Sequence, residues 1–238
     1  MSITVPTLAY LICGSPARNH DFDSARIRLH QALYNAGNIR TDVANNYDDA
    51  PAILNAEMLV TYTSQVPVGD EQCAALRSYL ENGGRWFAIH ASNSVKENPH
   101  LPGILGSRFL AHPPYMHYSV DVAKAADPLL EGMAAHFEVD DELYVIEQRD
   151  DIEVLLETEW GGDAMGHTHP NAVRPLMYRR PVGSGGVLYL ALGHANRPFD
   201  KPRPEWPDTP DRRGPWELPV YQELIRRGIA WAAGRRPL

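Results

Sequence analysis

The sequence has little cysteine and no long apolar run. Its two cysteines, Cys13 and Cys73, allow neither a disulfide framework nor a C-x-x-C metal motif, and we expect a reducing compartment. No apolar run approaches the length of a membrane span, and the N-terminal LAYLIC segment is too short for a signal sequence. These absences predict a cytoplasmic protein with no membrane partner.

Clusters of positive charge and the common cofactor motifs are also missing. Basic residues never run longer than a pair of arginines, and the formal net charge is -8, which argues against a nucleic-acid partner. No G-x-G-x-x-G, P-loop or G-x-S-x-G motif is found, so we expect no nucleotide cofactor and no serine nucleophile elbow. Cys13 is interpreted as a buried core thiol.

Apolar segments and helical patterns alternate in the first half of the chain. Short apolar runs predict strands at LAYLIC (8–13), IRTDVA (39–44), MLVTYT (58–63) and RWFAIHA (85–91). Two helical segments lie between them, one with Ile27, His30, Leu33 and Tyr34 on its expected apolar face and one with Cys73, Leu76, Tyr79 and Leu80. This alternation predicts βαβ units, right-handed crossovers and a parallel sheet.

The second half of the chain is less regular. Further strands are predicted at MHYSVDVA (116–123), ELYVIE (142–147), IEVLLET (152–158), RPLMYRR (174–180) and VLYLALG (187–193). GSGG at 183–186 is interpreted as a hairpin turn. A closing helix places Tyr221, Leu224, Ile225, Gly228 and Ala232 on one face. We find no linker, and predict a single domain over residues 1–238.

Titratable side chains follow two of the predicted strands. His90 and His194 each end a long apolar run, and ligands bind beyond the carboxyl ends of strands in open parallel sheets. An acidic cluster of Asp140, Asp141 and Glu142 precedes another apolar segment. A carboxylate near two imidazoles can be a metal ligand or a general base. The alternatives are buried histidines bonded to neighbouring carbonyls and a solvated acidic turn.

Four other histidines are weaker candidates. His112 and His117 flank a Pro-Pro-Tyr turn, in which proline restricts the backbone. His167 and His169 form an H-x-H pattern that suits a metal on one side of an extended strand, and it is equally typical of a surface loop.

Five motifs in order resemble one known family. They are GGRWFAIHAS, LGSRFLAHPP, DELY, SGGVLYLALGH and RRGIAWAAG. Together they resemble the trehalose-utilization, or ThuA-like, family of the class I glutamine amidotransferase-like superfamily, over most of the chain from the second helix onward. The sequence departs from the family pattern in FAIHAS, which lacks the usual glycine two residues before the histidine.

The resemblance implies a flavodoxin-like three-layer α/β/α sandwich with a mostly parallel central sheet. It also implies that His90-Ala91 occupies the place where glutamine amidotransferases carry a nucleophilic cysteine, so their thiolate chemistry is not expected. Similar proteins are linked to metabolism of trehalose and related glycosides, acting on oxidised (keto) sugars.

Two hypotheses follow for function. The first is an enzyme of isomerase or hydrolase type on a carbohydrate-like substrate, with His90, Glu142 and His194 as catalytic residues and as ligands of a possible divalent ion, zinc or manganese. His112, Tyr115, Tyr144 and Trp206 are the expected substrate-binding residues. The second is a non-catalytic sugar-binding or regulatory module that kept an amidotransferase-like scaffold.

The Pro-rich segment at 196–219 suggests an interface or an active-site loop. It carries two tryptophans, Trp206 and Trp216, which a small monomer would rarely expose. We therefore expect a homodimer.

Overall fold

The computed structural model describes residues 5–17, 19–95, 98–197 and 211–236. The strands are β1 (Thr7–Gly14), β2 (Ile39–Ala44), β3 (Met58–Thr63), β4 (Arg85–Ile89), β5 (Ser107–Ala111), β6 (Met116–Val122), β7 (His136–Asp141), β8 (Val145–Gln148), β9 (Glu153–Ala164), β10 (His167–Val182) and β11 (Gly185–Leu190). The helices are α1 (Phe22–Asn35), α2 (Ala50–Asn55), α3 (Asp70–Glu81), α4 (Leu101–Leu105) and α5 (Pro219–Ala232).

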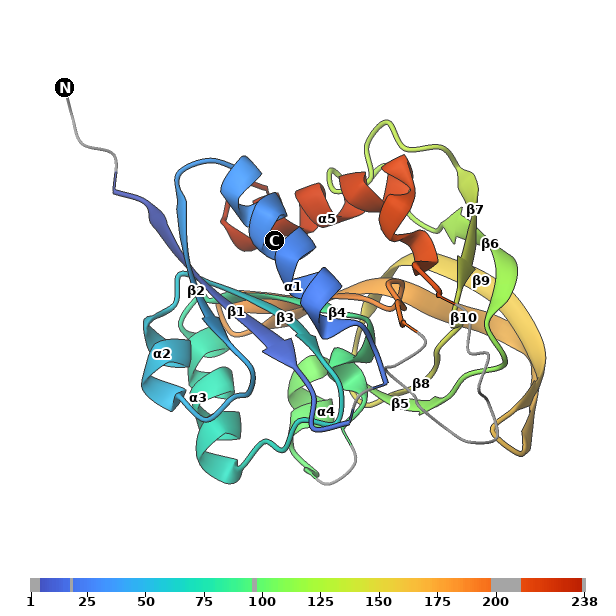
Figure 1. Cartoon of the computed structure of the whole chain (residues 1–238), viewed down its shortest axis with the longest axis horizontal. Helices are drawn as coiled ribbons and strands as arrows, with labels where there is room; N and C mark the ends of the chain where they lie inside the picture. Colours follow the sequence, from blue (N-terminus) through green and yellow to red (C-terminus); the bar gives the residue numbers. More distant parts are fainter. Residues whose placement is uncertain (1–4, 18, 96–97, 198–210, 237–238) are drawn as a thin grey trace.

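A nine-stranded sheet organises the molecule, in the order β2-β1-β3-β4-β11-β10-β9-β6-β7. The pairs from β2 to β11 are parallel, and those from β11 to β7 are antiparallel. Helices α1 and α5 cover one face of the parallel part, while α2 and α3 cover the other (Figure 1). The predicted α/β/α sandwich is confirmed, and its sheet is parallel at one end.

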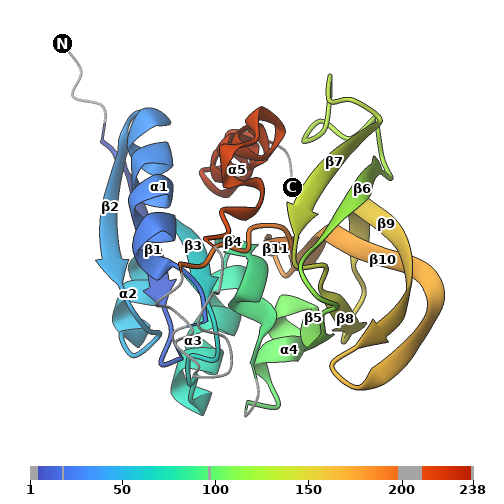
Figure 2. The same cartoon turned by 45° about the vertical axis from the view of Figure 1, so that its right-hand side comes forward.

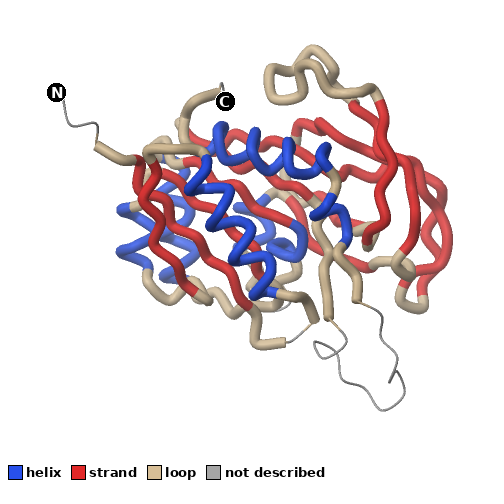
Figure 3. The backbone as a smooth tube through the Cα atoms, turned by 45° about the horizontal axis from the view of Figure 1, so that its top comes forward, coloured by secondary structure: helices blue, strands red, loops and turns tan. Residues whose placement is uncertain are grey.

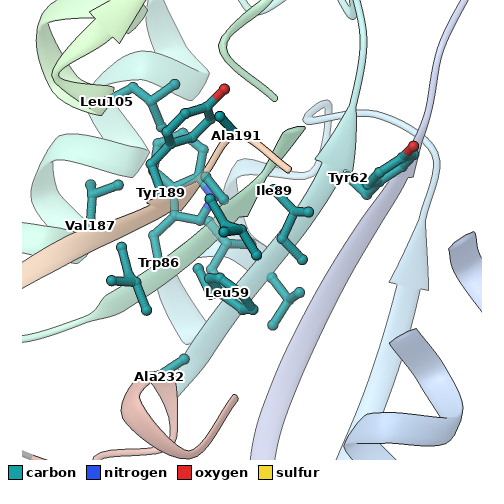
Figure 4. Packing of buried hydrophobic residues seen from close by; sticks show 14 of the residues in the cluster. Leu59, Tyr62, Trp86, Ile89, Leu105, Val187, Tyr189, Ala191 and Ala232 are labelled. Carbon is teal, nitrogen blue, oxygen red and sulfur yellow. The ribbon is translucent and has the colours of Figure 1, made fainter. Parts of the chain in front are cut away.

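The core lies between the parallel strands and these helices. Trp86 of β4 pairs in register with Val187 of β11, and both are fully buried. Figure 4 shows these side chains with Tyr189 in the packed interior. The Trp86 indole N–H donates to Thr61 Oγ1 at 2.9 Å, so the one polar atom of this large side chain is satisfied.

Two of the three predicted helix faces are correct. The apolar residues expected on α3 and α5 are all buried. On α1, however, Ala25, Leu29 and Leu33 face the core, while Ile27 and Tyr34 are exposed. Of the predicted stripe on α1, Leu33 is correct, but the buried face repeats every four residues through Ala25 and Leu29 rather than through Ile27 and His30.

The antiparallel end of the sheet forms a long curved arm. Strands β9 and β10 extend as a hairpin and curl around the side of the molecule (Figure 2). Register shifts between His169 and Ala172 and around Pro175 and Met177 interrupt this pairing, and such irregularities increase local twist and bending. The predicted GSGG turn connects β10 to β11, as their antiparallel pairing from Val182 to Gly185 shows.

Two smaller features complete the fold. Strands β5 and β8 form a separate two-stranded antiparallel sheet. A short 3₁₀ helix, His90–Asn93, follows β4, and another, Gly214–Glu217, precedes α5.

Helices α1 and α5 lie side by side on their face of the sheet in Figure 3. Within the described residues, no helix has both the length and the apolar character needed to cross a membrane.

Candidate metal centre

His90 is turned into the protein directly after β4. Its φ of 50° lies in the left-handed region, which is uncommon for a residue other than glycine, and the backbone there begins a 3₁₀ turn. The ring is fully buried, and its Nδ1 lies 2.6 Å from the Ala191 carbonyl. Because a carbonyl only accepts, Nδ1 carries the hydrogen and Nε2 presents a lone pair, as a metal-ligating histidine requires.

His194 and Glu142 face each other across the site. His194 Nε2 lies 2.8 Å from Asn196 Oδ1, which accepts its hydrogen and leaves the lone pair on Nδ1. That Nδ1 lies 3.0 Å from Glu142 Oε2, although its direction does not satisfy a hydrogen bond. Two electron-pair donors at this distance repel unless a proton or a cation lies between or beside them.

Asp141 fixes the chain segments that carry these two side chains. One carboxylate oxygen accepts from Gly193 N at 2.7 Å, and the other accepts from His194 N and Glu142 N, each at 2.9 Å. Asp141 is fully buried at the end of β7. One carboxylate therefore joins the loop after β7 to the loop after β11.

His20 completes the cluster from the loop after β1. Its Nε2 lies 3.1 Å from His90 Nε2, and the next residue, Asp21, donates its backbone N–H to the Ala195 carbonyl at 2.7 Å. Four side chains thus meet, and one ligand atom from each lies within 4.8 Å of the others: His20, His90, Glu142 and His194. All four are at most 5% exposed.

Burial and the neighbouring imidazoles set the protonation of the cluster. Burial lowers the pKa of His90 to about 3, and nearby His194 acts in the same direction, so this ring is neutral at physiological pH. Burial alone would raise the pKa of Glu142, but His194, His112 and His20 hold it well below its usual range. Three imidazoles and one ionised carboxylate are a donor set typical of zinc or manganese.

Burial raises the pKa of both Asp141 and Cys13. Burial raises the pKa of Asp141 to about 7, against the effect of its backbone N–H donors. Cys13 is fully buried in the core, as predicted, and burial raises the pKa of its thiol to about 12.

Three of the expected substrate-binding residues lie around the cluster. The Tyr144 ring centroid is 4.3 Å from that of His90, the Tyr115 ring is 6.0 Å from that of His194, and His112 Nδ1 is 3.9 Å from Glu142 Oε1. Trp206 lies outside the described residues. The structure therefore brings His90, Glu142 and His194 together with these side chains, and the roles assigned to them stay predictions.

The other three weaker histidine candidates lie elsewhere. His117 is exposed and faces Asp140, with Nδ1 3.2 Å from Oδ1. His167 and His169 lie at the start of β10, where they pair with β9. Asp140 and Asp141 of the acidic cluster are the last residues of β7, and Glu142 follows them. The cluster does not directly precede a strand, since the next strand, β8, begins at Val145.

His20 is the cluster member that the sequence analysis missed. It follows no apolar run directly, since the loop after Gly14 separates it from β1. A usable signal was present: His20 immediately precedes the N-cap of α1, and this loop lies at the carboxyl edge of the same parallel sheet as His90.

A pocket of about 590 Å³ adjoins the cluster at this edge. We call it the β1–β3 pocket, because its walls come from the loops after β1, β2 and β3 and from the start of α1. Its residues include Ser15, His20, Asp23, Arg26, Asn45 and Val66.

The fold and this side-chain cluster define an α/β sandwich protein with a candidate buried metal centre. The chain belongs to the ThuA family, described as trehalose utilisation, whose family model matches residues 11–205. No curated protein matches the chain.

Solved structures show the same fold. A ThuA-like protein from Parabacteroides merdae ATCC 43184 superposes with a TM-score of 0.74 at 19% identity, covering 97% of this chain and 91% of that one. A ThuA-like protein from Bacteroides uniformis ATCC 8492 gives 0.70 at 17%, covering 99% and 95%. A β-galactosidase from Rahnella sp. R3 gives 0.61 at 14%, covering 98% of this chain and 32% of that much longer one.

Proposed function

We propose that this chain is a metal-dependent enzyme of carbohydrate metabolism. His20, His90, Glu142 and His194 would hold one divalent ion, zinc or manganese, and the substrate would be a trehalose- or glycoside-derived sugar bearing a carbonyl group. The reaction would be of isomerase or hydrolase type. The family's description as trehalose utilisation supports the substrate class.

One observation carries this proposal: four buried ligand atoms from four separate segments converge within 4.8 Å. The hydrogen bonds of His90 to Ala191 and of His194 to Asn196 leave the lone pairs of both rings inside the cluster. Such outer contacts fix the tautomer of a metal-ligating histidine. A purely structural polar cluster would instead be expected to satisfy the buried Nδ1 of His194 with a well-directed donor.

The chemistry follows from the donor set and its surroundings. A bound divalent ion supplies a Lewis acid for a carbonyl and a means to activate water. His112 donates its Nδ1 hydrogen to the Pro113 carbonyl at 2.8 Å, which leaves Nε2 able to exchange a proton. Its side chain is 27% exposed, more than any cluster member, so it is the candidate for proton transfer with a substrate.

A second candidate function is a non-catalytic sugar-binding or regulatory module. The near-complete burial of the cluster favours this alternative, because a sealed metal stabilises a fold without contacting substrate.

Turnover distinguishes the two proposals. Purified protein loaded with Zn²⁺ or Mn²⁺ is incubated with keto derivatives of trehalose and of simple glucosides, and products are followed by NMR. The enzyme proposal predicts turnover that chelation abolishes and that His194→Ala lowers by about a hundredfold or more. His117→Ala, on an exposed ring outside the cluster, serves as the control and retains activity. Unchanged turnover in both His90→Ala and His194→Ala would contradict the proposal.

A further inference from the structure

The β1–β3 pocket has a position that suits a ligand. In the order β2-β1-β3, strand β2 lies on one side of β1 and strand β3 lies on the other. The direction in which the chain adds strands to the sheet therefore reverses at β1. Such a switch point opens a crevice at the carboxyl ends of parallel strands, where ligands of open α/β sheets bind. We propose that this pocket binds a neutral, hydroxyl-rich ligand of sugar type, with Arg26 and Asn45 as the residues that determine its specificity.

This inference rests on the proposed function, because it places the substrate of the metal centre. His20 belongs to both features: it is a cluster member and part of the pocket wall. On other sides, aromatic rings lie against the cluster. Tyr62 stacks at 6.1 Å from His90, Tyr144 lies at 4.3 Å from it, and Tyr115 lies at 6.0 Å from His194, all as ring-centroid distances. One approach to the cluster therefore runs from this pocket through His20.

The polar groups of the pocket both donate and accept hydrogen bonds. Asn45 Oδ1 accepts from Arg26 Nη2 at 3.0 Å, and no hydrogen bond within the described residues uses its Nδ2 hydrogens. Ser15 Oγ accepts from Ala17 N at 2.9 Å and keeps its own hydrogen for a ligand. Asp23 uses Oδ1 for Arg26 and keeps Oδ2 as an acceptor. Because the pocket offers both donors and acceptors, it matches the hydroxyl groups of a ligand, which donate and accept hydrogen bonds. A phosphate oxygen only accepts them.

The charges in the pocket argue against an anionic ligand. Among the described residues of the wall, Arg26 is the one guanidinium; its Nη atoms already donate to Asp23 at 3.1 Å, to Asn45 and to the Cys13 carbonyl at 2.8 Å, and its remaining N–H, at Nε, is buried. Asp21, also in the wall, is paired with Arg213 at 2.9 Å. In the described part of the wall, a bound phosphate would meet the carboxylate of Asp23 and no guanidinium that lacks an acidic partner, which disfavours it. Phe22 and Val66 add apolar surface for the C–H face of a sugar ring.

Calorimetric titration of the full, Zn²⁺-loaded chain tests the assignment. Trehalose and glucose are the neutral probes, and their 6-phosphates are the anionic ones. We expect a neutral probe to bind, and its phosphate to bind about tenfold more weakly. Arg26→Met and Asn45→Ala should each weaken neutral binding by about fivefold to tenfold, the effect of one lost hydrogen bond, and leave the metal content unchanged.

Matched controls and the metal content separate the outcomes. Arg77→Met on α3 and Asn35→Ala on α1 remove the same residue types outside the pocket, and these variants should bind the neutral probes as the wild type does.

The assignment is overturned if neither neutral probe binds, if a phosphate binds more tightly, or if Tyr115→Ala weakens binding while Arg26→Met and Asn45→Ala do not. A chain that binds sugar through Arg26 and Asn45 but holds no ion contradicts only the proposed enzyme. A chain that holds the ion and binds no sugar contradicts only the pocket assignment.

Discussion

Asp141 is the residue on which the geometry of the cluster depends. Its buried carboxylate accepts three backbone N–H groups from the segments that carry Glu142 and His194. Hydrogen bonds to a charged group are stronger than neutral ones, and an unsatisfied buried donor is costly. The side chain is thus a positioning residue for two prospective ligands.

Replacing Asp141 by Asn should therefore weaken both the fold and the metal site. The amide keeps one acceptor but turns an NH₂ group towards a backbone N–H. We expect a loss of about 2–3 kcal/mol in the free energy of unfolding and about tenfold or more weaker metal binding. Denaturant titration and competition with a metal-binding dye measure the two effects. Asp140→Asn, at the exposed neighbouring position, is the control, and equal effects in both variants would contradict this role.

His90 should make the metal-free protein sensitive to acid. Its folded pKa of about 3 lies below its ordinary value of 6.5. At pH values between about 3 and 6.5, His90 is therefore protonated in the unfolded chain and neutral in the folded chain. Because the unfolded chain binds the extra proton, the free energy of unfolding falls as the pH drops below about 6.5. Between pH 7 and pH 5 the wild type should lose about 2 kcal/mol more than His90→Asn, in which asparagine tolerates the left-handed backbone.

Chemical denaturation of chelator-treated protein at several pH values measures this difference. His30→Asn, on an exposed ring of α1, should keep the acid sensitivity of the wild type. Parallel pH profiles for the wild type and His90→Asn would show that the buried ring takes up its proton without cost to the fold.

At the scale of elements, packing of α5 on the sheet leaves no room at Gly228. A Cβ placed there would lie 2.4 Å from the ring of Phe87, which is itself fully buried in β4. Gly228→Ala should therefore destabilise the fold by about 1–3 kcal/mol, although alanine favours a helix.

The contrasting variant is Gly103→Ala in α4, where a Cβ meets nothing within 4 Å. It should stabilise the fold by about 0.5–1 kcal/mol through helix propensity and reduced freedom of the unfolded chain. Thermal unfolding of both variants measures the difference. A gain in stability for Gly228→Ala would contradict the close approach of α5 to β4.

The inner strands of the parallel half, β3, β4 and β11, were predictable because their apolar runs are buried on both faces, whereas the edge strand β2 is half-exposed. MLVTYT matches β3 at both ends, and LAYLIC is β1 without its terminal residues. The last predicted strand was too long, since β11 ends at Leu190 and Ala191 to Gly193 continue as a loop. Apolar residues alone do not mark that end, because the loop is buried as well.

At the scale of the whole molecule, the site depends on the curvature of the sheet. β7 lies at the edge of the sheet, four strands away from β11, yet Glu142 after β7 meets His194 after β11. The antiparallel end must therefore curl so that the end of β7 comes back toward β11, as Figure 2 shows. Sequence patterns placed His90 and His194 at one edge, but this closure and the contribution of His20 are tertiary features that no local pattern records.

The predicted homodimer has less support from the structure than from the sequence. Trp216, one of the two tryptophans behind that prediction, is 4% exposed and donates to the Gly193 carbonyl at 2.8 Å. It packs within its own chain, and Trp206 lies outside the described residues. The dimer stays a prediction, and sedimentation at micromolar concentration tests it: a single species of one chain's mass would contradict it.

The metal content of the purified chain tests the central claim most directly. Elemental analysis, combined with X-ray absorption at the edge of the bound metal, reports both the amount of the ion and its ligands. We predict about one zinc or manganese ion per chain, a first shell of nitrogen and oxygen without sulfur, and loss of the ion in the His194→Ala variant. A wild-type chain that neither carries such an ion nor takes one up after chelation and reloading would contradict the account.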